Sequence, residues 1–117
     1  MPLSLGIEHR GEVLFGTRQG SDLCHVEGRQ TIFERSDPIY YAAVMRETLP
    51  RGARLVLELD VDGVTVGPFP VEVDPPLDCI GTARSMAPLG SGTYVIRFRD
   101  DSRPGSPDLA TGTFTVR

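Results

Sequence analysis

Apolar and polar residues alternate most clearly in residues 54–66. Residues 55–61 read Leu-Val-Leu-Glu-Leu-Asp-Val and lead directly into Asp62-Gly63. Asp-Gly is a preferred two-residue turn between antiparallel strands, because both positions tolerate a positive φ. The pattern therefore predicts a β-hairpin in which Val61 lies opposite Val64.

The second arm of this hairpin is predicted to be irregular. Val64 and Val66 are expected to point inward, but Phe69 and the valines that follow it have the opposite parity. A bulge or kink is therefore expected near Gly67-Pro68. Pro68 and Pro70 indicate an edge strand, since proline has no N–H for a ladder. Phe69 is then either a contact for a partner or a core residue between protective prolines.

The remaining alternating stretches are also short. Gly and Pro interrupt the chain every eight to twelve residues or so, and no window of helical length has apolar residues at helical spacing. Further strands are expected in residues 12–17, 23–26, 30–34, 38–47, 79–86, 93–99 and 113–117. The pattern predicts an all-β fold with little or no helix, a two-sheet antiparallel sandwich of about seven to nine strands.

Length and composition favour one domain. The chain has 117 residues, which we divide into a flexible N-terminal arm, residues 1–10, and a single β-sandwich domain, residues 11–117. No stretch reaches the roughly 18 apolar residues that a membrane span needs, so no membrane insertion of this segment is expected. All 12 basic residues are Arg and Asn is absent, a bias that indicates a high-GC bacterial genome. A net charge of -4 argues against nucleic-acid partners.

The end of the chain carries a family resemblance. The strand beginning Gly92-Thr93-Tyr94 is followed by a loop and by Gly112-Thr113-Phe114-Thr115-Val116. With Pro38-Ile39-Tyr40-Tyr41 and the turn Leu49-Pro50-Arg51-Gly52, this order resembles bacterial extracytoplasmic immunoglobulin-like or fibronectin-type-III-like domains. The resemblance implies a sandwich in a secreted or membrane-anchored protein, exported by a signal not present in this chain. The absence of Trp departs from antibody-type domains.

The two cysteines fit this setting. In a small β domain of a bacterial surface, Cys24 and Cys79 would be joined by a disulfide, which the loop-entropy account values at about 4 kcal/mol. Cys79 precedes the Gly92-Thr93-Tyr94 strand, so the bridge would not be the usual one between the sheets. Two buried thiols are one alternative, and a reactive or metal-binding thiol is the other.

No constellation specifies a reaction, so we expect no enzyme, no cofactor and no metal. His25 follows Cys24, but adjacent residues of a strand point to opposite faces, which argues against a cysteine–histidine pair. Acids in residues 100–108, namely Asp100, Asp101 and Asp108, leave a Ca²⁺ site as a less favoured alternative.

The remaining candidates suit a binding surface. Arg97 and Arg99 share a face and would oppose Glu58 and Asp60, with anion recognition as an alternative. Tyr40 and Tyr41 point to opposite faces, so one of them is free for binding. We expect a non-catalytic extracytoplasmic binding or sensory module for a protein or glycan, and the alternative is a structural spacer. The candidate contact residues are Phe69, Tyr40, Arg97 and Arg99.

Overall fold

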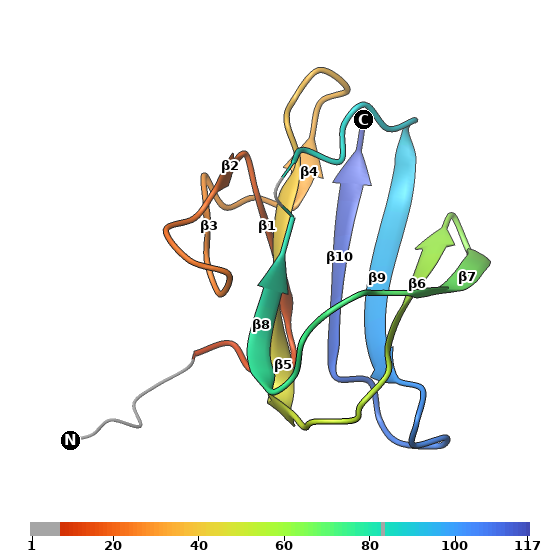
Figure 1. Cartoon of the computed structure of the whole chain (residues 1–117). Helices are drawn as coiled ribbons and strands as arrows, with labels where there is room; N and C mark the ends of the chain where they lie inside the picture. The colour runs from red at the N-terminus through yellow and green to blue at the C-terminus, as the bar shows by residue number, and fades with distance from the viewer. Residues whose placement is uncertain (1–7, 83) are drawn as a thin grey trace.

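The computed structural model describes residues 8–82 and 84–117, and within them the protein is all-β without a helix (Figure 1). The strands are more numerous than expected, because three of them have only two residues. In chain order they are β1 (Val13–Gly16), β2 (Arg18–Gln19), β3 (Val26–Glu27), β4 (Ile32–Phe33), β5 (Tyr40–Leu49), β6 (Leu55–Val61), β7 (Val64–Pro70), β8 (Leu77–Gly81), β9 (Gly92–Asp100) and β10 (Ala110–Val116).

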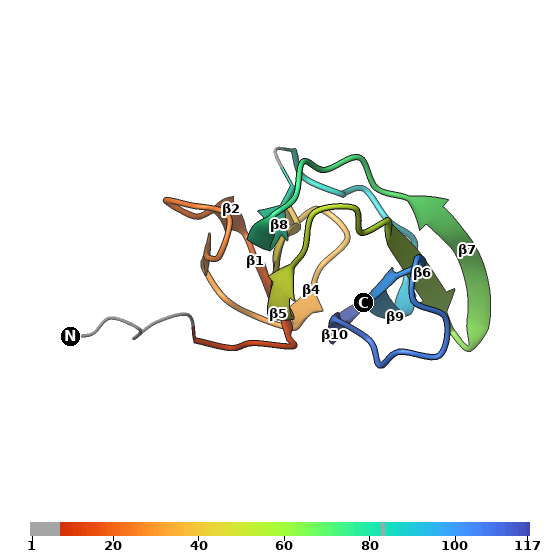
Figure 2. The same ribbon diagram turned by 60° about the horizontal axis from the view of Figure 1, so that its bottom comes forward.

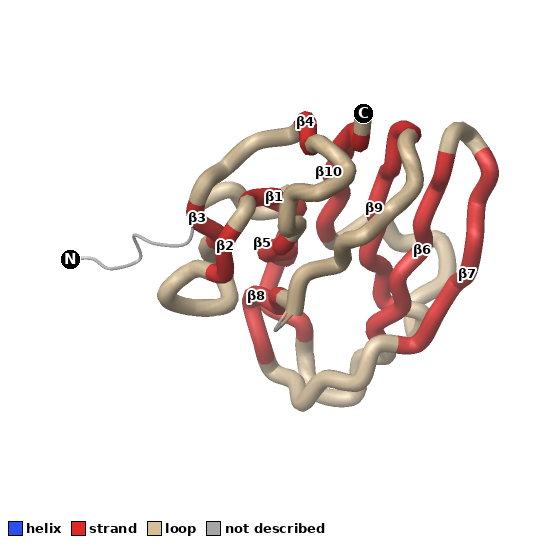
Figure 3. Tube along the Cα trace, turned by 90° about the horizontal axis from the view of Figure 1, so that it is seen from above, coloured by secondary structure: helices blue, strands red, loops and turns tan. Residues whose placement is uncertain are grey.

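The long strands form two layers. One sheet has the order β1-β5-β8 and the other has the order β4-β10-β9-β6-β7, while β2 and β3 pair only with each other. β4 runs parallel to β10, and the other pairs are antiparallel. Viewed from above, β10, β9, β6 and β7 stand side by side, with β5 and β8 on the other side of the core (Figure 3). The fold prediction is confirmed as an all-β arrangement that fits a two-sheet sandwich.

Aromatic side chains from both sheets fill the centre of the core. The Phe114 ring of β10 lies 4.7 Å from the Phe15 ring of β1 and 5.0 Å from the Tyr94 ring of β9, on which it is stacked. Phe33 of β4 meets it edge-on at 6.0 Å. Such pairs contribute to stability beyond the apolar area that they bury, and Phe114 is the ring that all three contacts share.

The two sheets meet along a seam between β1 and β10. Glu12 forms an isolated parallel bridge to Thr111, and the Thr111 N–H donates to the Gly11 carbonyl oxygen at 3.0 Å. The next residue is Gly112, where an added Cβ would lie 2.4 Å from the Val13 carbonyl oxygen. Only glycine allows the two backbones to approach this closely.

The predicted hairpin is confirmed. Val61 pairs with Val64 across Asp62 and Gly63, whose φ angles are 51° and 87°. The register of β6 against β7 shifts between Leu57 and Leu59, so the bulge expected near Gly67-Pro68 is present. The bulge places Phe69 opposite Leu57, on the face that already carries Val64.

The expected burial of β7 is wrong. Pairing with Val61 and Leu59 places Val64 and Val66 on the inner face, yet the two side chains are 66% and 42% exposed. The reason is the unequal width of the sheets. β7 is the edge of a five-stranded sheet, and the three-stranded sheet opposite does not extend over it (Figure 2). The prediction that the proline-marked segment is an edge strand is confirmed.

Two other boundaries also differ from expectation. The strand expected at 79–86 is displaced, since β8 ends at Gly81 and the Ser85 hydroxyl instead accepts the Ile39 N–H at 2.9 Å. Residues 1–7 of the expected N-terminal arm lie outside the described residues. Arg10, at its end, is anchored through hydrogen bonds to the Met45 carbonyl oxygen at 3.1 Å and to Asp78 at 3.0 Å.

Candidate functional site

Ion pairs occupy the outer face of the β6–β9 pair. Both terminal nitrogens of Arg97 donate to the Asp60 carboxylate, at 2.9 and 3.1 Å, and Arg99 donates to Glu58 at 3.1 Å. The hydrogen bond from Arg97 lowers the pKa of Asp60, with a second contribution from the Thr65 hydroxyl, and the same pairing raises the pKa of Arg97. The expected opposition of arginines and acids is thus present, and the guanidinium groups are engaged within the sheet.

The cysteines form a disulfide, with Cα atoms 5.2 Å apart. It joins the β2–β3 ribbon, which we define as residues 17–28, to β8. Under this ribbon, on the outer face of the three-stranded sheet, lies a second apolar cluster that contains Leu14, Val26, Ala42, Val44 and Cys79, with Cys24 and Tyr40 packed against it. Tyr40 is half-buried there, whereas Tyr41 packs in the main core at 5.8 Å from Phe98.

His25 has an acidic partner instead of a thiol. Its Nδ1 lies 2.7 Å from Asp22 Oδ1, and the Cys24 N–H donates to the same oxygen at 2.8 Å. The hydrogen bond with His25, followed by that from Cys24, lowers the pKa of Asp22. Because Cys24 is consumed in the disulfide, this loop offers no free thiolate for chemistry.

Asp100 is the buried charged side chain of the described residues, at 4% exposure. Its Oδ1 accepts the Arg54 N–H, the Ser102 N–H and the Ser102 hydroxyl, while Oδ2 has no protein partner. Burial raises the pKa of Asp100, but the three hydrogen bonds outweigh it and hold the pKa below its usual value. The residue organises the turn after β9.

The calcium alternative finds no support in the loop after β9. Within residues 8–82 and 84–117 no three acidic, histidine or cysteine side chains gather as metal ligands would. Asp100, Asp101 and Asp108 therefore do not converge in the way that the alternative requires.

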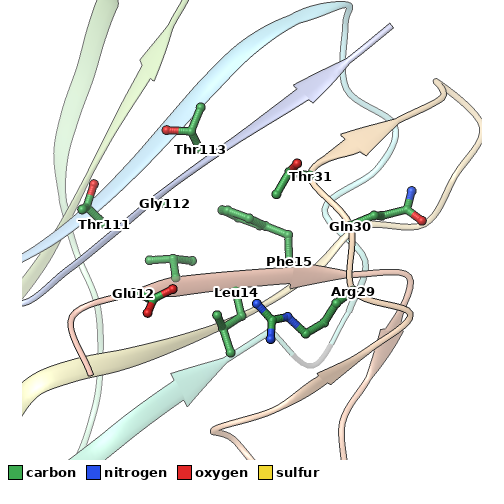
Figure 4. Close-up of a pocket in the computed structure, with 10 residues that line it drawn as sticks. Glu12, Leu14, Phe15, Arg29, Gln30, Thr31, Thr111, Gly112 and Thr113 are labelled. Atoms are coloured by element: carbon green, nitrogen blue, oxygen red, sulfur yellow. The ribbon is translucent and has the colours of Figure 1, made fainter. Parts of the chain in front are cut away.

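A groove of about 440 Å³ opens along the seam between β1 and β10 (Figure 4). The Phe15 ring points from β1 toward β10 and forms its apolar floor, while Arg29, Gln30 and threonines form a polar rim. Its lining contains no cysteine, histidine or aspartate, and its one carboxylate is that of Glu12.

The most distinctive exposed feature lies on β7. Five large apolar side chains of the described residues are exposed, and three of them are Val64, Val66 and Phe69. They share a face with their half-buried partners on β6, which are Val61, Leu59 and Leu57. We call the exposed three the β7 surface. Beside its Pro70 end lies a cavity of about 510 Å³.

The four predicted contact residues do not come together. Phe69 lies on the inner face of the five-stranded sheet, Arg97 and Arg99 lie on its outer face, and Tyr40 lies under the ribbon. Sequence reasoning identified Phe69 but missed Val64 and Val66. The signal that could have found them was the pair of prolines, because an edge strand of a wide sheet extends beyond its opposing layer.

Comparisons with known proteins give no match. No protein-family model matches the chain, and neither a curated protein nor a solved structure is significantly similar to it. Among the described residues, no helix is long and apolar enough to cross a membrane.

Proposed function

We propose that this chain is an immunoglobulin-like domain that serves as a non-catalytic, extracytoplasmic binding module. The strand order supports the fold assignment. If β1, β5, β6, β7, β8, β9 and β10 are taken as strands A, B, C, C′, E, F and G, the sheets have the orders A-B-E and β4-G-F-C-C′, with β4 paired in parallel with β10. Apart from β4 and the missing strand D, this order resembles the immunoglobulin arrangement.

A local feature of β9 supports the same assignment. The Tyr94 hydroxyl, two residues into this strand, donates to the Gly90 carbonyl oxygen at 2.6 Å. A tyrosine near the start of strand F that bonds back to the backbone a few residues upstream is the tyrosine corner of immunoglobulin-like domains. The usual cysteine position, two residues later, holds Ile96.

The disulfide supports the compartment. Disulfides persist in oxidising environments and are rare in the reducing cytosol. The bridge between Cys24 and Cys79 joins a peripheral ribbon to a sheet edge. Strands of two residues form few contacts of their own, so the ribbon needs the disulfide to stay in place. The disulfide can do this only in a compartment where it is not reduced.

The binding role is carried by one observation, the β7 surface. Three large apolar side chains are exposed together on the inner face of β7, the half of the hairpin that has no opposing layer. Clustered exposed apolar residues on a soluble domain mark an interaction site, whereas isolated ones need no explanation. A domain that only holds its neighbours apart would not need such a cluster.

Photo-crosslinking tests this proposal. The full natural protein is expressed in its own host cells with p-benzoylphenylalanine in place of Phe69. A matched control carries p-benzoylphenylalanine in place of Ile32. Both positions are exposed and lie on opposite edge strands of one sheet. We expect a discrete adduct at position 69, none at position 32, and recovery of the protein from an exported fraction. No adduct at either position would favour the spacer alternative.

A further inference from the structure

The β2–β3 ribbon makes its polar contacts within itself. Among the described residues, every hydrogen bond and ion pair of residues 17–28 joins two residues of the ribbon, from the β2–β3 ladder to the pairing of Asp22 with His25. β2 and β3 lie on the side of β1 and β5 that faces away from the five-stranded sheet (Figure 3). Between its two ends, the ribbon is therefore held by the Cys24–Cys79 bond and by apolar packing that includes Val26.

The ribbon covers an apolar face of the three-stranded sheet. Leu14, Ala42 and Val44 lie under it and are 5%, 1% and 0% exposed. Ala43, between two of them, packs in the main core, so these three side chains point away from that core. Displacement of the ribbon would expose them together with Tyr40.

The two cysteines differ in accessibility. Cys79 is 5% exposed in the cluster under the ribbon, whereas Cys24 is half-buried and packs against this cluster from the ribbon side. In thiol–disulfide exchange a thiolate attacks one of the two sulfurs, and the rate depends on access to that sulfur. An external thiolate is therefore expected to attack Cys24 Sγ, with Cys79 Sγ as the leaving group.

We propose that the Cys24–Cys79 disulfide is a redox-sensitive switch. Its reduction by an external dithiol releases the ribbon and uncovers the apolar face beneath, while the main core stays folded. The two apolar clusters share no side chain, so the main core keeps its packing when the ribbon opens. This inference gives the domain a second, concealed surface and does not depend on the β7 surface.

The exchange takes place in two steps. One thiol of the dithiol loses its proton to water and attacks Cys24 Sγ, the bond to Cys79 breaks, and Cys79 Sγ leaves as a thiolate that takes a proton from water. The second thiol then loses its proton and attacks the dithiol's own sulfur in the mixed disulfide, and Cys24 Sγ leaves and is protonated. The dithiol is oxidised to a disulfide, and its two electrons reduce the two cysteines to thiols.

The kinetics of reduction test this inference. The oxidised full chain is incubated with dithiothreitol at several urea concentrations below the unfolding transition, and the reduced fraction is measured by alkylation and intact mass. If the folded protein is the form that is reduced, the rate should rise in proportion to dithiothreitol and change less than ~2-fold with urea. A bond accessible only in the unfolded protein would be reduced in proportion to the unfolded fraction, which rises exponentially with urea.

The attacked sulfur is identified with a monothiol. Glutathione has no second thiol, so the reaction stops at the mixed disulfide when it is quenched by alkylation. We expect glutathione on Cys24 and the alkyl group on Cys79, as mapped by mass spectrometry of the digested protein.

Alkylation of Cys79 tests whether the face is uncovered. In Cys24→Ser the Cys79 thiol lies under a ribbon that has no disulfide. The matched control is Cys24→Ser/Cys79→Ser/Ile80→Cys, because Ile80 is the next residue of β8, is also buried at 8% exposure, and packs in the main core. Iodoacetamide should react at position 79 at least ~10-fold faster than at position 80. Melting curves check that both variants are folded.

Three results would overturn the inference. The first is a reduction rate that follows the unfolded fraction in urea, and the second is glutathione on Cys79 instead of Cys24. The third is equal alkylation at positions 79 and 80, because the ribbon would then stay closed without its disulfide.

Discussion

The main core lies between the two large sheets, whereas the smaller cluster lies on the outer face of the three-stranded sheet under the β2–β3 ribbon. Side chains of long strands from both layers enclose the main core, with Phe114 at its centre. The smaller cluster is covered by two strands of two residues each, which pair only with each other.

The two clusters therefore depend on different forces. A main core of this kind is stabilised by the removal of apolar area from water and by close packing. A two-stranded ribbon is at best marginal by itself, so the packing of its Val26 against the outer face of the three-stranded sheet depends on the covalent bond between Cys24 and Cys79. The core should unfold as a cooperative unit, while the ribbon should open locally.

The largest effect is expected in the main core. Phe114→Ala removes the ring that contacts Phe15, Phe33 and Tyr94, and should lower the free energy of unfolding by about 3–5 kcal/mol. Denaturant titration measures it, with Ile32→Ala at an exposed position as the control. A loss below about 1 kcal/mol would mean that Phe114 is not central to stability.

Removal of the disulfide separates the two regions. Cys24→Ser/Cys79→Ser should lower stability by about 2–4 kcal/mol. Hydrogen exchange should show a larger loss of protection in the ribbon than in β9 and β10, whose protection should fall only by the change in global stability. Uniform loss of protection in all strands would contradict the distinction between the clusters.

Intact mass after alkylation, with and without prior reduction, reports whether the disulfide is present in the exported protein.

Gly112 tests the seam that closes the main core. Gly112→Ala places a Cβ against the Val13 carbonyl oxygen and should lower stability by about 1–3 kcal/mol. Gly90→Ala is the matched control, because the nearest atom to its Cβ would be the Tyr94 hydroxyl at 4.0 Å. Equal melting temperatures for the two variants would show that the seam can relax.

Tyr94→Phe tests the corner at the start of β9. The ring stays stacked on Phe114 while the hydroxyl bond to Gly90 is lost, so stability should fall by about 1 kcal/mol. Thermal melting measures the change. An unchanged melting temperature would show that the hydrogen bond between the Tyr94 hydroxyl and the Gly90 carbonyl oxygen does not stabilise the fold.

The smallest effect concerns the ribbon in acid. Hydrogen bonds with His25 and Cys24 lower the pKa of Asp22 in the folded protein. The ionised carboxylate therefore stabilises the ribbon fully above the unfolded pKa of about 3.9, and this stabilisation is lost as the pH falls through the folded pKa. Exchange at Cys24 and His25 should therefore accelerate relative to β9 below about pH 4. Asp22→Ala is expected to abolish this pH dependence, and a wild-type profile in that variant would exclude Asp22 as its source.

Part of the fold follows from local patterns. Alternation in residues 55–61 and the Asp62-Gly63 turn predict the hairpin and its register, because both are properties of neighbouring residues. The burial of Val64 and Val66 does not follow, because it depends on which strand of the other sheet lies opposite. The location of Tyr40 under the ribbon is equally non-local, since Val26 and Leu14 come from separate strands.

The sequence by itself determined the all-β class, the hairpin, its bulge and the prolines of its edge, since each depends on backbone preferences within a few residues. Only the tertiary structure decided that the five-stranded sheet extends beyond the three-stranded one and leaves Val64, Val66 and Phe69 exposed. The disulfide between Cys24 and Cys79 was expected from the sequence and is confirmed, and the tertiary structure adds that it ties the β2–β3 ribbon to β8. Strand order brings distant segments together, and alternation within one strand carries no information about its neighbours.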